Sequence, residues 1–69
     1  MNVADFVRVR GSISKPEFGW GVLDHTNIGF VHSFDEDFSD QVIVDFPEQR
    51  CWRGLTSELE VVVDNSKGV

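Results

Sequence analysis

Cysteine is almost absent from this chain, which has 69 residues and only Cys51. One thiol cannot form an internal disulfide bond, so we expect an intracellular domain, cytoplasmic or nuclear, that relies on its apolar core for stability. Cys51, His25 and His32 are too few and too scattered for a zinc site, and no spacing marks either histidine as a base for a cysteine nucleophile. The sequence therefore predicts no metal, no cofactor and no catalytic residue, and we expect that the protein is not an enzyme.

Basic residues and long apolar runs are also scarce. The chain has six Lys and Arg against 12 Asp and Glu, for a net charge of −6. Non-specific binding to nucleic acid depends on a basic surface, so we expect no nucleic-acid partner. No apolar run approaches the ~20 residues of a membrane-spanning helix, and the first residues lack the basic and apolar regions of a signal peptide. We therefore expect no membrane partner.

Large apolar side chains are abundant for so short a chain, which has two Trp, six Phe and many Val. A single domain of this size buries only about 60% of the surface that its unfolded chain exposes, so most of these side chains are needed in one core. Alternation of apolar and polar residues predicts strands over 6–10, 27–34 and 41–46. A segment centred on Trp52 and ended by Gly54 has the composition of a fourth strand, and residues 60–63 that of a fifth.

A single tight helical turn over residues 56–59 precedes the last predicted strand. This order of elements predicts an all-β, five-stranded SH3-like barrel with one short 3-10 turn before the last strand. We expect the barrel to span residues 6–63, with a lead-in at 1–5 and a disordered tail or linker at 64–69. Residues 35–40 should form an exposed, acidic hairpin tip that binds no metal tightly. The predicted core residues are Val7, Val9, Val31, Val44, Leu59 and Val61.

Several short motifs follow one another along most of the chain. They are Arg-Val-Arg at 8–10, Pro-Glu-Phe-Gly-Trp-Gly at 16–21, Ile-Gly-Phe-Val at 28–31, Val-Asp-Phe at 44–46, Trp52 with Gly54, and Ser-Glu-Leu-Glu-Val-Val at 57–62. In this order and spacing they resemble the SH3-like repeats of Mind bomb and Keep on Going type E3 ubiquitin ligases. The hairpin tip departs from the resemblance, because these repeats often have a tight Asp-Gly turn there. The resemblance implies a non-catalytic module, excised or free-standing, that recognises a substrate or partner protein.

The candidate partner-binding residues are Phe18, Trp20, Arg50 and Arg53. The first two lie in an irregular loop over residues 15–26, whose glycines allow positive φ angles, and such loops often carry function. The other two flank Trp52, and both Trp and Arg are enriched at interface hot spots. We hypothesise that an exposed Trp20 anchors a protein or peptide segment of acidic character. We expect the isolated domain to be a monomer.

Two other interpretations stay open. In one, four aromatic side chains box a methylated lysine beside Asp45, as in Tudor or chromo domains, since an aromatic box suits an alkylated ammonium group. The four are Phe18, Trp20, Phe46 and Trp52. In the other, the domain is only a spacer in an array, with no ligand of its own. The four aromatic side chains are also the size of residues that a core this small needs, so they can instead fill the core. Ordinary SH3 binding to proline-rich peptides is disfavoured, because its groove relies on tyrosines and this chain has none.

Overall fold

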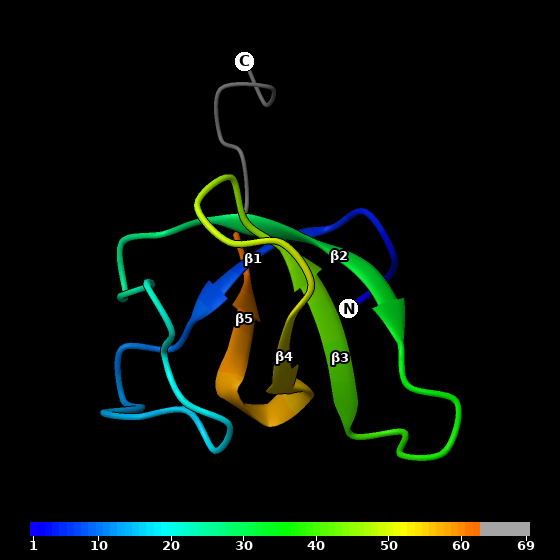
Figure 1. Cartoon of the computed structure of the whole chain (residues 1–69). Coiled ribbons are helices and arrows are strands. Elements are labelled where there is room, and N and C mark those ends of the chain that lie inside the picture. Colours follow the sequence, from blue (N-terminus) through cyan, green and yellow to red (C-terminus); the bar gives the residue numbers. More distant parts are fainter. Residues whose placement is uncertain (63–69) are drawn as a thin grey trace.

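A computed structural model describes residues 1–62 of the chain. Within that range, five antiparallel strands form one curved sheet in the order β4-β3-β2-β1-β5 (Figure 1). The elements are β1 (Phe6–Val9), β2 (Gly29–Phe34), β3 (Gln41–Asp45), β4 (Trp52–Leu55), the 3-10 turn η1 (Thr56–Glu58) and β5 (Leu59–Val61). The predicted all-β fold, with five strands and one 3-10 turn before the last strand, is therefore confirmed. Among residues 1–62, β4 and β5 do not pair, so the barrel-like sheet is not closed. No helix in these 62 residues is long and apolar enough to cross a membrane.

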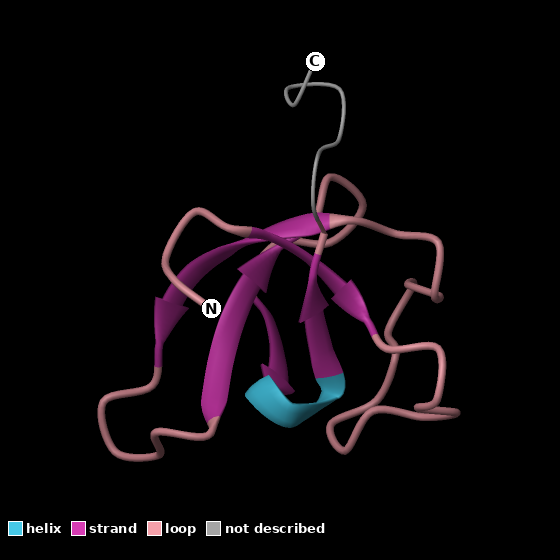
Figure 2. Cartoon of the chain, turned by 180° about the vertical axis from the view of Figure 1, so that it is seen from behind, coloured by secondary structure: helices cyan, strands magenta, loops and turns pink. Residues whose placement is uncertain are grey.

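The core lies on the inner face of the sheet, where alternation along each strand collects the apolar side chains. Val7 points inward from β1 while Phe6 points outward. Val31 of β2 pairs with Val44 of β3, and both are fully buried. The turn η1 joins β4 to β5 at one end of the sheet (Figure 2). The buried apolar residues are Val7, Val9, Leu23, Val31, Val42, Val44, Phe46, Trp52 and Leu59.

Val61 is the one predicted core residue that the structure places elsewhere. Its side chain is 45% exposed. It is the last residue of β5, an edge strand that begins at Leu59, one residue before its predicted start. A side chain at the end of an edge strand has a neighbouring strand on one side only, here Val7 of β1. Residue 63 and the predicted tail at 64–69 lie outside the described residues.

Gly54 lies inside β4 and does not end it. The strand continues to Leu55, and Gly54 pairs with Val42 of β3. A Cβ atom at Gly54 would collide with the indole ring of Trp52, two residues earlier on the same face. Close packing of that ring, and not a turn, therefore accounts for the glycine.

Val44→Ala is expected to lower the free energy of unfolding by roughly 1–3 kcal/mol, because it removes two methyl groups from a filled site. The matched control is Val61→Ala, which removes the same atoms from a half-exposed side chain. We expect a change of less than about 0.5 kcal/mol in the control. Urea denaturation of both variants measures the difference, and equal losses would show that the register of β3 is wrong.

Candidate functional site

The glycine-rich loop between β1 and β2 is fastened to the C-terminal half of the domain. The indole N–H of Trp52 donates to the carbonyl oxygen of Gly19 at 3.2 Å. The carboxylate of Glu58 accepts the backbone N–H of Glu17 at 2.7 Å. Gly19 has a φ angle of +90°, as predicted for the loop glycines. The loop is therefore held in place by side chains from a distant part of the sequence, Trp52 and Glu58.

Trp20 packs against the core, and its predicted exposure is wrong. The side chain is half-buried and stands edge-on to the ring of His25, with 4.9 Å between the ring centroids. Its indole N–H donates to the carbonyl oxygen of Ser14 at 3.2 Å, and Nε2 of His25 lies 2.6 Å from the carbonyl oxygen of Ile13. Trp20 therefore holds the loop together, whereas its neighbour Phe18 is exposed.

Arg53 is bound to the hairpin tip, residues 35–40, through Asp35. Its guanidinium forms an ion pair with Asp35 at 2.8 Å and also donates to Oε1 of Gln41 at 2.8 Å. Asp35 also accepts the backbone N–H groups of Asp37 at 2.8 Å and Phe38 at 3.0 Å. The hydrogen bond from Arg53, together with these two N–H groups, lowers the pKa of Asp35 below its ordinary 3.8. Arg53 thus orders a tip that is acidic and exposed, as predicted.

Acid should remove the stability that the ion pair between Asp35 and Arg53 contributes to the fold. Because the pKa of Asp35 is lowered in the folded protein, its ionised form stabilises the fold above the ordinary pKa of 3.8, and this contribution is lost as the pH falls through the lowered pKa. We expect the stability of the wild type to fall more steeply than that of Asp35→Asn between about pH 5 and pH 2. Urea denaturation across this range measures both, and parallel curves would show that the ion pair adds nothing.

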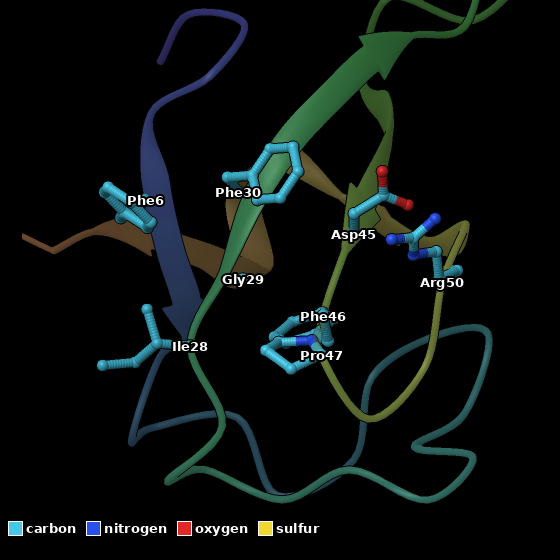
Figure 3. A pocket seen from close by; sticks show the side chains of 8 residues that line it. All are labelled: Phe6, Ile28, Gly29, Phe30, Asp45, Phe46, Pro47 and Arg50. Carbon is cyan, nitrogen blue, oxygen red and sulfur yellow. The ribbon is translucent and has the colours of Figure 1, made fainter.

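Arg50 lines a pocket of about 370 Å³ on the outer face of the sheet, at the end of the β2–β3 hairpin away from the tip (Figure 3). The lining residues are Phe6, Ile28, Gly29, Phe30, Asp45, Phe46, Pro47 and Arg50. Strand register explains the grouping. Phe6 pairs with Phe30, and Phe30 with Asp45, so the three side chains form one row across β1, β2 and β3.

The pocket walls are apolar and open to solvent. Phe6, Ile28 and Phe30 are 57%, 42% and 43% exposed, while the ring of Phe46 beside them is buried. Gly29 contributes no side chain, and a Cβ atom there would lie 2.9 Å from ring carbons of Phe46. Glycine at this position therefore lets the backbone of β2 approach both the carbonyl oxygen of Asp45 and the Phe46 ring.

Two charged side chains stand at the rim of the pocket, Asp45 and Arg50 (Figure 3). The carboxylate of Asp45 accepts the backbone N–H of Cys51 at 2.9 Å, which fastens the turn after β3. Among residues 1–62, Arg50 forms no ion pair. Its guanidinium can therefore receive a carboxylate from outside the domain.

The pocket includes one of the four residues that the sequence predicted as one site. Arg50 lines the pocket, but Phe18, Trp20 and Arg53 do not. That these four residues bind a partner stays a prediction. The sequence interpretation missed the pocket walls, although the alternation of β1 and β2 placed their apolar side chains, including Phe6, on the outward face.

The aromatic box for methylated lysine is not formed by its four predicted members. Phe46 and Trp52 are both buried and pack edge-on, with 5.7 Å between their ring centroids. Trp20 packs against the same core from the loop. Of the four, only Phe46 contributes to the pocket beside Asp45. In residues 1–62, no three His, Cys, Asp or Glu side chains are grouped as a metal ion would need.

Comparison with known proteins finds short segments of ubiquitin ligases that are similar to this chain. The chain is 41% identical over all 69 of its residues to E3 ubiquitin-protein ligase HERC2 of Mus musculus and of Homo sapiens. It is 49% identical over 35 residues, 51% of the chain, to E3 ubiquitin-protein ligase KEG of Arabidopsis thaliana. No family model and no solved structure matches the chain. The chain spans about 1% of the length of the HERC2 proteins and 2% of KEG, so it is similar to one short segment of each ligase.

Proposed function

We propose that this domain is a non-catalytic recognition module of the Mind bomb repeat type, which holds a segment of a substrate or partner protein. The proposal places it in the cytoplasm or nucleus, within a multidomain protein of the ubiquitin-ligase type. The similarity to segments of HERC2 and KEG supports this setting. The observation that carries the proposal is the pocket, where three exposed apolar side chains surround a cavity with an arginine at its rim.

The chemistry of the pocket supports a protein ligand. Single exposed apolar residues are common, but a contiguous apolar patch is typical of an interaction site. Phe6 and Phe30 are cross-strand neighbours, so one apolar side chain of a partner would contact both rings. Aromatic residues and Arg are enriched where a few contacts dominate the binding energy. A carboxylate beside the inserted side chain would pair with Arg50, which favours a partner segment of acidic character.

Selection of random peptides displayed on phage against the domain tests the proposal. We expect the selected peptides to lose roughly 30-fold in affinity for Phe30→Ser, since loss of an anchor contact costs about 2 kcal/mol. The matched control is Phe34→Ser, which changes the same residue type on the same strand outside the pocket. The side chain of Phe34 is also exposed, so this control should keep wild-type affinity. Isothermal titration calorimetry measures both variants, after circular dichroism has shown that they are folded.

Three outcomes would contradict the proposal that the pocket is the recognition surface. One is an equal loss of affinity in the two variants. Another is peptide binding that survives Phe30→Ser and disappears in Phe18→Ser, which would return recognition to the loop between β1 and β2. Repeated failure to select any peptide would favour the interpretation of the domain as a spacer.

A further inference from the structure

We propose that the pocket also receives the hairpin tip of a second copy of this chain, so that copies associate head to tail. The proposal rests on the binding pocket proposed above and names one occupant for it. It joins two surfaces of the same molecule. One is an apolar pocket with Arg50 at its rim, and the other is an acidic tip on which Phe38 is exposed.

The hairpin tip presents Phe38 on an ordered turn. The side chain of Phe38 is 57% exposed, and its backbone N–H donates to Oδ1 of Asp35 at 3.0 Å. The other carboxylate oxygen of Asp35 accepts from Arg53 at 2.8 Å. Since these bonds order the turn before any partner arrives, insertion of the Phe38 ring would not have to order the backbone as well. Such preorganisation lowers the entropic cost of binding.

The charges around Phe38 complement the rim of the pocket. Glu36, Asp37 and Asp40 are exposed, and none of them forms an ion pair among residues 1–62. A carboxylate next to the inserted ring can pair with the guanidinium of Arg50, in the bidentate geometry that arginine favours. The ring itself would replace water against the apolar pocket walls.

A single chain cannot make this contact with itself. The pocket includes Gly29 and Asp45, at the start of β2 and the end of β3, whereas the tip follows the other end of β2. The six residues of β2, at about 3.3 Å each, separate the two surfaces by about 20 Å. Figures 1 and 2 show the tip and the turn after β3 at opposite ends of the domain. The contact uses a different surface of each copy, so it can repeat along a row of copies.

The contact is expected to be weak. Copies with a net charge of −6 repel one another, and Asp45 adds a negative charge at the rim. One aromatic anchor and one ion pair are also far less than a stable interface contains. We expect a dissociation constant on the order of 1 mM. The isolated domain would then be monomeric at micromolar concentration.

NMR spectra of the ¹⁵N-labelled domain from about 0.05 to 1.5 mM, a range that brackets the expected dissociation constant, test the proposal. We expect amide shifts near Phe30 and near Phe38 to change with concentration in the wild type. Phe38→Ala lacks the tip contact and Phe30→Ser lacks the pocket contact, so each variant alone should give spectra that do not change with concentration. Both side chains are exposed, so both variants should keep the fold.

The decisive step mixes the two variants. Labelled Phe38→Ala keeps its pocket, so an excess of unlabelled Phe30→Ser, which keeps its tip, should shift the pocket amides and leave the tip amides unchanged. Exchange of the labels should reverse the pattern. A mixture with unchanged spectra, or concentration-dependent shifts in either variant alone, would overturn the head-to-tail contact. If phage-selected peptides still bind the pocket of Phe38→Ala in that case, only this contact fails. If they do not, the proposed function fails with it.

Discussion

Trp52→Ala is expected to lower the free energy of unfolding by about 3–5 kcal/mol, the range for truncation of a large buried aromatic side chain. The ring is buried, packs edge-on against Phe46 and donates its N–H to the carbonyl oxygen of Gly19. One side chain therefore joins β4 to the core and to the loop between β1 and β2. Domains of this length have a total stability of roughly 3–10 kcal/mol, so the loss would be a large fraction of the total.

Trp52→Phe separates the packing of this side chain from its hydrogen bond. The variant keeps an aromatic ring but leaves the carbonyl oxygen of Gly19 without its donor, so we expect a smaller loss of about 1–3 kcal/mol. Urea denaturation followed by circular dichroism ranks the wild type and the two variants. A Trp52→Ala protein that unfolds at the wild-type midpoint would show that this ring does not belong to the core.

Glu58→Ala is expected to lower the free energy of unfolding by roughly 2–4 kcal/mol. The side chain is buried, and its carboxylate accepts two backbone N–H groups, from Glu17 at 2.7 Å and from Leu55 at 3.3 Å. Truncation leaves both donors in a partly buried site without an acceptor, and each loss costs about 1–2 kcal/mol there. Equilibrium denaturation in urea measures the change.

The matched control for Glu58 is Glu60→Ala. It also removes a carboxylate, but from a surface ion pair with Arg8 at 2.7 Å. Pairs of this kind contribute about 0–1 kcal/mol. If the two variants lost the same free energy, the carboxylate of Glu58 would have to be solvated, and it would not fasten the loop to η1.

The strands could be predicted because local alternation determines which residues face the core. Val7 and Val9 alternate with outward residues, and the β-branched run that includes Val44 forms the central strand β3. Alternation gives the face of a residue but not what covers it. Val61 therefore has the parity of a core residue and yet lies half-exposed at the end of an edge strand. The prediction that Gly54 ends its strand was wrong for a similar reason. The glycine is needed because the Trp52 ring packs against it, and a sequence pattern does not show such packing.

The candidate site was harder to predict because its residues meet only through strand register and distant contacts. Phe6 and Phe30 face outward on two strands, but only their pairing makes them one surface. The two glycines beside Trp20 indicated an exposed ring, whereas an acceptor in its own loop, the carbonyl oxygen of Ser14, holds the side chain inward. The contact of Glu58 with the loop spans 41 positions of sequence, and no local pattern encodes such a contact. Of the four predicted site residues, the pocket contains Arg50 alone.

Amide shift mapping with a phage-selected peptide tests most directly whether the pocket is the recognition surface. The ¹⁵N-labelled domain is titrated with that peptide, and the shift changes are assigned residue by residue. We predict that the largest changes fall on Gly29, Phe30, Asp45 and Arg50, at the end of the β2–β3 hairpin away from the tip. Largest changes in residues 15–26, with the pocket amides unmoved, would contradict the proposed recognition surface.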